Sequence, residues 1–232
     1  MARRRARSST ARGKKGNPEQ MAAALGLAGA VLLLPFLITS IVYFNILKNR
    51  YLQSPSAQRV VDFYKVFWLF AKGAIAAGVI GFFSIVAVMS ILDAFIGGEN
   101  PSNASQIVAW SLALIPLVIF GIILGLRVAV FYLGIIADGE NDILFFPHDM
   151  RSYTLGDYIS MRFIKGLYSI SCVKLSEISR ITRGYGVELY IHGAFGSRKI
   201  TMHDKQKRDE CIFMIRDHSG KKGIVGGEIE NY

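Results

Sequence analysis

Two basic residues inside long apolar stretches, Lys72 and Arg127, are the first candidates for chemistry in this sequence. Ionisable groups are costly in hydrocarbon, so such residues can couple ions or relay protons in a transporter or channel. Long basic side chains near helix ends can instead extend to lipid headgroups. At about 1.5 Å per residue, both lie roughly 33–38 Å from the turn at 97–105, near the opposite membrane face. That position favours headgroup contact.

The remaining residues show no spacing typical of a catalytic or metal site. The sequence contains no Walker loop, dinucleotide fingerprint, HExxH, GxSxG or paired metal-binding carboxylates. Cys172 and Cys211 are far from any CxxC spacing and have apolar neighbours, which predicts two buried thiols and no disulfide. We therefore predict that the protein is not an enzyme and holds no metal or cofactor.

Three apolar segments dominate the first part of the chain. Of the 232 residues 52% are hydrophobic, more than ordinary soluble domains carry. Because about 20 apolar residues cross a 30 Å hydrocarbon core, we predict membrane helices at 21–47, 63–96 and 106–137 within a membrane part at 21–137. Pro35 predicts either a kink or a re-entrant hairpin in the first, so two to three helices are expected.

Small residues recur in the second segment between 73 and 81. Small side chains let helix backbones approach closely in lipid. We expect this stretch to contact a protein partner or a second copy of the chain. Its small residues are Gly73, Ala74, Ala76, Ala77, Gly78 and Gly81.

Residues 1–20 form a basic tail, which we predict to be disordered. It contains seven Lys and Arg residues against one acid, Glu19. Such a tail can set topology, contact anionic headgroups or bind nucleic acid. No aromatic residue separates the charges to stack on bases, which disfavours nucleic acid. The residues expected to contact lipid headgroups are Arg3, Arg4, Arg5, Arg7, Lys14, Lys15, Lys72 and Arg127.

The side of the membrane that the C-terminal part reaches depends on the first segment. Lys and Arg close to the spans favour the cytoplasm. Three simple spans place the tail opposite the connector that carries Lys48, Arg50 and Arg59. A re-entrant first segment turning at Pro35 instead puts the tail, the connector and the C-terminal domain together on the cytoplasmic side of a bacterial inner membrane. The path of the first segment stays open between these arrangements, and we expect the C-terminal domain on the cytoplasmic side.

A small soluble domain is predicted over 142–220. Apolar and polar residues alternate at 168–172 and 187–191, which is typical of half-buried strands. Glycine-rich turns separate the runs, and an amphipathic helix is predicted at 204–217. The expected fold is therefore a membrane α-helical segment plus a small α+β domain, a bent antiparallel sheet or barrel closed by a terminal helix. A flexible tail is expected at 221–232.

The C-terminal pattern resembles a known family. The run at 173–181, Val-Lys-Leu-Ser-Glu-Ile-Ser-Arg-Ile, precedes a glycine turn, a strand, a Gly-Ser turn, a Lys-Ile strand and a helix. This order, with an entry strand at 141–147, resembles the bacterial pleckstrin-homology-like domains attached to membrane helices. The resemblance implies a scaffold that binds proteins or lipids. The basic residues it suggests for partner or lipid contact are Arg180, Arg183, Arg198 and Lys199.

Together these patterns predict an integral membrane interaction or assembly protein of a bacterial inner membrane. Its soluble domain would dock a protein partner or lipid, and a secretion or conjugation apparatus is one host for it. The alternative is a small transporter or channel subunit that uses Lys72 and Arg127 within the membrane.

Overall fold

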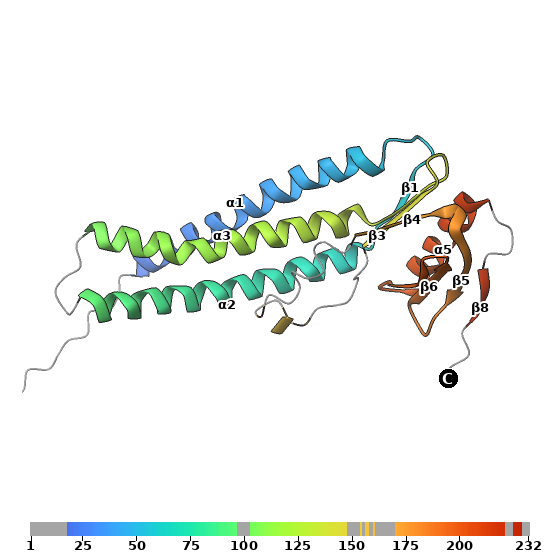
Figure 1. The fold of residues 1–232 in the computed structure, drawn as a ribbon. Helices are drawn as coiled ribbons and strands as arrows, with labels where there is room; N and C mark the ends of the chain where they lie inside the picture. Colours follow the sequence, from blue (N-terminus) through green and yellow to red (C-terminus); the bar gives the residue numbers. More distant parts are fainter. Residues whose placement is uncertain are drawn as a thin grey trace, which may run out of the picture.

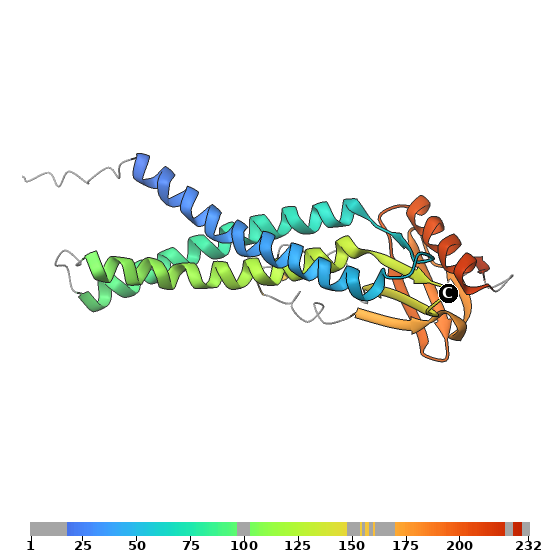
Figure 2. The same ribbon diagram turned by 90° about the horizontal axis from the view of Figure 1, so that it is seen from above.

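Three long helices and a group of strands make up the chain, seen here in a computed structural model (Figure 1). It describes residues 18–96, 103–147, 154, 156–157, 160, 170–220 and 225–228. The long helices lie side by side, and the strands gather at one end of them (Figures 1 and 2). The helices are α1 (Pro18–Tyr51), α2 (Phe63–Ile96), α3 (Asn103–Leu133) and the shorter α5 (Lys205–Ser219).

Helix α1 is continuous through Pro35. It begins at the end of the bundle away from the strands and ends beside them, where α2 begins and α3 ends (Figures 1 and 2). The expectation of a re-entrant hairpin at Pro35 is therefore wrong, because the proline removes one backbone donor without turning the chain. The start of α1 and the connector that follows it lie at opposite ends of the bundle.

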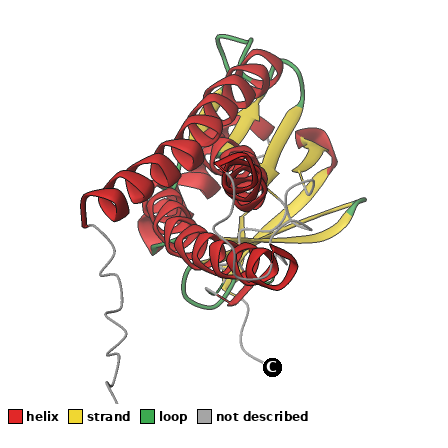
Figure 3. Cartoon of the chain, turned by 90° about the vertical axis from the view of Figure 1, so that its left-hand side faces the viewer, coloured by secondary structure: helices red, strands yellow, loops and turns green. Residues whose placement is uncertain are grey.

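Glycines bring α3 close to both of its neighbours (Figure 3). A methyl group at Gly125 of α3 would lie 2.7 Å from the carbonyl oxygen of Phe36 in α1. On α2, methyl groups at Gly73 and Gly81 would meet leucine side chains of α3 at 2.5 and 3.2 Å. The backbones of α1 and α3 therefore approach closely at Gly125, whereas at Gly73 and Gly81 the leucine side chains of α3 fill the space that a larger residue would need.

The small-residue stretch 73–81 packs mainly within the chain. Gly73 and Gly81 lie against leucine side chains of α3 in the same chain. The expected contact with a partner or a second copy stays a prediction. Four members of the stretch are buried within the chain. These are Gly73, Ala76, Ala77 and Gly81, whereas Ala74 and Gly78 are exposed.

Two helices are long and apolar enough to cross a membrane, at Phe63–Val88 in α2 and Leu114–Leu133 in α3. Large hydrophobic side chains cover the outside of the bundle, and Leu34, Phe82 and Phe83 are 60% or more exposed. Soluble monomers rarely expose apolar patches of more than a few hundred Å². The exposed faces therefore indicate association with a membrane.

The strands form two four-stranded sheets that do not close into a barrel. Neighbouring strands are antiparallel except for β5 and β8, which are parallel. The first sheet has the order β1-β2-β3-β4, with strands Gln58–Val60, Ile135–Asp138, Ile143–Pro147 and Ile170–Lys174. The second has the order β7-β6-β5-β8, with strands Gly196–Thr201, Glu188–Gly193, Ile178–Arg183 and Val225–Glu228.

Two strands of the first sheet lie outside the predicted domain at 142–220. Strand β1 belongs to the connector between α1 and α2, and β2 follows α3 directly. Gly134, with φ of 76°, makes the turn from α3 into β2. A side chain at this position would strike the carbonyl oxygen of Val60 in β1. The sheet is thus joined to the helices at two separate points of the chain.

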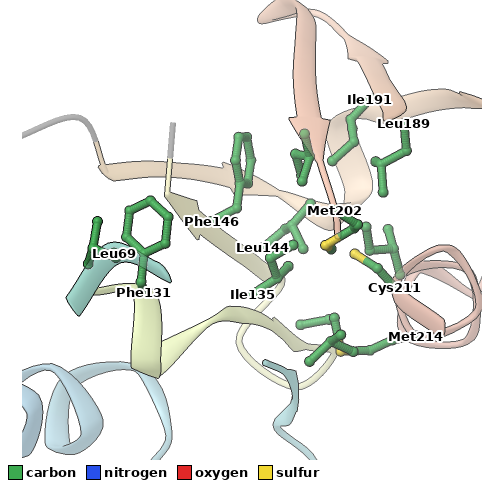
Figure 4. Close-up of a cluster of buried hydrophobic side chains, with 14 of the residues drawn as sticks. Leu69, Phe131, Ile135, Leu144, Phe146, Leu189, Ile191, Met202, Cys211 and Met214 are labelled. Carbon is green, nitrogen blue, oxygen red and sulfur yellow. The ribbon is translucent and has the colours of Figure 1, made fainter. Parts of the chain in front are cut away.

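One hydrophobic core runs from the bundle into the strand domain. Figure 4 shows Leu69 and Phe131 of the long helices at one side and Leu144, Met202 and Cys211 gathered beneath α5. The predicted terminal helix is confirmed as α5: it begins after Asp204, whose side chain accepts a hydrogen bond from Lys207 N at 2.6 Å. It ends at Gly220, with φ of 63°.

The two cysteines differ in exposure. Cys211 is buried, as predicted, and desolvation raises the pKa of its thiol far above the ordinary value. Cys172 is exposed, so the prediction of a buried thiol is wrong there. Its strand, β4, lies at the edge of the first sheet, where apolar neighbours in sequence do not ensure burial.

Candidate docking groove

Side-chain hydrogen bonds hold the connector between α1 and α2 against the strand domain. Ser56 Oγ donates to Asp138 Oδ1 at 3.2 Å, and Ser54 Oγ donates to Glu140 Oε2 at 2.5 Å. His218 of α5 places its Nε2 2.9 Å from the carbonyl oxygen of Ser56. These contacts fix β1, the outer strand of the first sheet, beside α5.

Asp138 is the central acceptor of this junction and is only 4% exposed. It also accepts hydrogen bonds from Asn141 Nδ2 at 2.7 Å and from the backbone N of Glu140 at 3.1 Å. Desolvation by burial acts to raise the pKa of Asp138, but the hydrogen bonds from Asn141, Ser56 and Glu140 lower it overall. The junction therefore favours the charged carboxylate.

Asp62 joins α2 to the loop that precedes α5. Its Oδ1 accepts a hydrogen bond from the backbone N of Lys65 at 3.2 Å, which caps α2. Its Oδ2 accepts one from the backbone N of His203 at 2.6 Å. The His203 ring stacks on Tyr64 with centroids 3.5 Å apart, and Lys65 Nζ donates to the carbonyl oxygen of Thr201. The start of a long helix is thus bonded directly to the strand domain.

A groove of about 580 Å³ lies between β1 and α5. Strand β1 is an edge strand, so one side of its backbone faces away from β2. One stripe of α5 forms the opposite wall, and Phe213 on this stripe is 47% exposed. The residues that line the groove are Gln58, Arg59, Val60, Gln206, Asp209, Glu210, Phe213, Met214 and Asp217.

The lining of the groove is acidic, although the chain as a whole has a formal charge of +10. It contains three carboxylates and one guanidinium, and the guanidinium of Arg59 lies over the Tyr132 ring of α3, 5.8 Å from its centroid. Desolvation acts to raise the pKa of Asp209, but hydrogen bonds and charge from Arg208 and Arg183 lower it overall. The groove therefore presents ionised acids beside an exposed aromatic ring.

The other two carboxylates have partners on their own helix. Glu210 pairs with Lys207 at 2.6 Å, and Asp217 pairs with Arg216 at 3.0 Å. Exposed ion pairs of this kind contribute about 0–1 kcal/mol each. A cation from another molecule can therefore replace these partners at little cost.

The basic residues predicted to contact lipid headgroups have different environments. The tail residues Arg3, Arg4, Arg5, Arg7, Lys14 and Lys15 lie outside the described part of the chain. Lys72 is half-buried on α2. Arg127 is 1% exposed, with its guanidinium carbon 4.7 Å from the centroid of Phe131, so its side chain does not extend to the surface as expected. It lies one helical turn from Leu124 and from Phe131, which are themselves buried.

The four basic residues predicted on the soluble domain lie on two different faces of the second sheet. The register places Arg180 beside His192 and Lys199 beside Tyr190, on one face. It places Arg183 beside Leu189 and Arg198 beside Ile191, which belong to the core face. Arg183 Nε donates to Asp209 Oδ1 at 3.3 Å. Side chains alternate along a strand, so the four residues do not form one basic site.

The face of the second sheet opposite Ile181 and Ile191 carries a hydrogen-bonded row that the sequence did not suggest. His192 lies between Thr182 Oγ1, 2.8 Å from Nε2, and Ser197 Oγ, 2.7 Å from Nδ1. Beside it Lys199 pairs with Glu188, whose hydrogen bond raises the pKa of the lysine. Within the described ranges no group of three or more His, Cys, Asp and Glu side chains is placed to hold a metal ion.

The groove itself was not predicted, because its strand wall has only three residues within a polar connector. The sequence of α5 contains one feature that indicated a binding surface. Phe213 lies on the charged face of this amphipathic helix, where a polar residue is usual. No family model matches this chain, and neither a curated protein nor a solved structure matches it.

Proposed function

We propose that this chain is an integral membrane protein whose strand domain docks an extended, basic segment of a partner protein in the groove between β1 and α5. The observation that carries the proposal is that β1, the edge strand of the first sheet among the described residues, lies opposite an acidic face of α5 around the exposed Phe213. An extended segment can add to a sheet edge through its backbone, while pockets for alternate side chains give specificity.

Charge and exposure specify the partner. Three carboxylates line the groove, so Lys or Arg side chains complement it and acidic segments are repelled. Phe213 is 47% exposed, and aromatic residues of this kind commonly act as binding anchors. Because β1 lies in the connector between two long helices, the groove is held close to the bundle. A partner in the same membrane or at its surface fits this position.

The membrane part of the proposal includes α1 as a third span. Its 34 residues correspond to about 51 Å at 1.5 Å per residue, longer than the hydrocarbon core. What supports spanning is the exposed apolar surface of α1, which includes Leu34, Leu37, Ile38 and Ile41. We assign the protein to a bacterial inner membrane, as an assembly component of the kind found in secretion or conjugation machines. If α1 crosses the membrane, the basic tail before it and the strand domain lie on opposite sides of the membrane. The basic residues of the tail then no longer argue that the strand domain is cytoplasmic.

The strand domain has an element order that supports a pleckstrin-homology-like scaffold. Strands β2, β3 and β4 are consecutive and antiparallel, as are β5, β6 and β7, and α5 follows. Here β1 extends the first sheet, and the sheets remain open. A scaffold of this class serves binding, in agreement with the proposed docking role.

The experiment is site-specific photocrosslinking in native membranes with the full chain. A photoreactive phenylalanine replaces Phe213 in the groove, and a control replaces Tyr185, which is 81% exposed on a turn. We expect a discrete adduct from position 213 and none of the same mass from 185. The charge reversal Glu210→Lys should reduce the adduct several-fold, because it repels a basic segment.

A matched charge reversal outside the groove controls for net charge. Glu177→Lys makes the same change of charge at an exposed residue that follows β4 and lies outside the groove lining, and it should leave the adduct unchanged. If no adduct forms at 213, or if both reversals act equally, the groove is not the docking site.

A small transporter or channel subunit remains the alternative because Arg127 is buried inside the helical bundle. Buried charges in membrane helices commonly mark transport pathways. Arg127→Gln keeps a polar side chain while removing the charge. Loss of ion flux in vesicles with intact insertion would favour this function over docking.

A further inference from the structure

The C-terminal strand β8 is a weak element seated on the edge of the second sheet. It pairs in parallel with β5, and it is the last strand in the order β7-β6-β5-β8. Its sequence is Val-Gly-Gly-Glu, and glycine is disfavoured in strands because it loses the most conformational entropy on folding. The edge of β5 is therefore occupied by a segment with little intrinsic preference for a strand.

The ladder between β5 and β8 is also irregular. Ile181 pairs with Val225, and Arg183 pairs with Glu228, so three steps along β8 match two along β5. The extra residue disrupts the ladder locally. Within the described residues, the register between β5 and β8 is therefore interrupted between its two pairs.

Two positions along the edge of β5 define which side chains fit an added strand. Val225 packs against the core beside the fully buried Ile181. At the other end, Arg183 stands opposite Glu228 in register and is also bonded to Asp209 of α5. An incoming strand thus meets an apolar position followed by a basic one.

We propose that the edge of β5 is a strand-acceptor site, held by β8 in the free protein and taken by an extended segment of a partner protein that displaces β8. The preferred segment runs parallel to β5, carries an aliphatic residue at the position of Val225 and an acidic residue at that of Glu228. A partner segment without two adjacent glycines has a higher strand propensity than β8. It therefore replaces β8 beside β5. The charge preference of this surface is opposite to that of the groove between β1 and α5, and the ion pair between Arg183 and Asp209 joins the two surfaces.

The test uses a synthetic peptide of residues 221–232 as the probe, added to the protein in lipid nanodiscs. Three proteins are compared: the full chain, a chain that ends at Gly220, and the full chain with Val225→Asp. The truncated chain keeps the residue that ends α5. We expect both altered proteins to bind the peptide at least about tenfold more tightly than the full chain, because a tethered competitor reduces the fraction of free sites.

A peptide with Val225→Pro controls for specificity, because proline removes a ladder donor and the aliphatic contact. It should not bind any of the three proteins. Protection of the buried Cys211 from maleimide verifies that each protein is folded. Failure of folded, truncated protein to bind the peptide overturns the strand-acceptor site. Equal binding by the full chain overturns its occupation by β8, and neither result affects the groove.

Discussion

Replacement of Asp62 should loosen the contact between the helical bundle and the strand domain. Asp62→Ala removes the cap of α2, which costs about 1 kcal/mol. It also removes the hydrogen bond from the backbone N–H of the exposed His203 to a carboxylate, and a bond to a charged group contributes about 1–3 kcal/mol. The expected loss of local stability is about 2–4 kcal/mol.

Two variants separate the cap from the bridge. Asp204→Ala removes a comparable cap, that of α5, without any bond to the bundle, so a loss of about 1 kcal/mol is expected. Asp62→Asn keeps one acceptor oxygen and a good capping residue but presents an amide group in place of the second oxygen. It should therefore keep the cap of α2 and weaken the bond to His203.

Hydrogen exchange measured by mass spectrometry on the full chain in nanodiscs reads this contact directly. A loss of about 2 kcal/mol corresponds to roughly 30-fold faster exchange of the His203 amide. We expect this increase in Asp62→Ala, with little change at His203 in Asp204→Ala. Unchanged exchange at His203, or an equal effect of the two alanine variants, would refute the bridging role of Asp62.

Three further predictions follow from burial, charge and helix direction. The pKa of Asp138 is lowered on folding, so the charged carboxylate stabilises the protein above pH 3.8, and this stabilisation is lost as the pH falls below that value. The thermal unfolding temperature of Asp138→Asn should therefore depend less on pH in this acidic range. An unchanged pH dependence would contradict the proposed role of Asp138 at the junction. Maleimide should label Cys172 alone in the native protein and both cysteines after denaturation, and native labelling of Cys211 would mean that α5 is misplaced. In a cysteine-free background, single cysteines at Ser8 and Gln53 should react with a membrane-impermeant maleimide from opposite sides of the membrane. Reaction from the same side would support a re-entrant first segment instead.

Local patterns in the sequence were sufficient for the regular elements. Long apolar runs produced the long helices, because their length and composition act within a single segment. Alternation and glycine turns indicated the hairpins of the second sheet, and Asp204 and Gly220 marked the two ends of α5. Each of these signals depends on residues that are neighbours in the chain.

Other features were decided only by contacts between distant segments. Residues Gln58–Val60 become a strand because Ile135–Asp138 lies beside them, and neither run is long enough to indicate a strand alone. Gly73 faces α3 and Arg127 is buried because helix packing, absent from any single segment, selects the inward faces. The groove and the edge of β5 likewise exist only where separate elements meet. The sequence therefore determined the long helices, α5 and the hairpins of the second sheet, whereas tertiary packing determined β1, β2 and the surfaces available for binding.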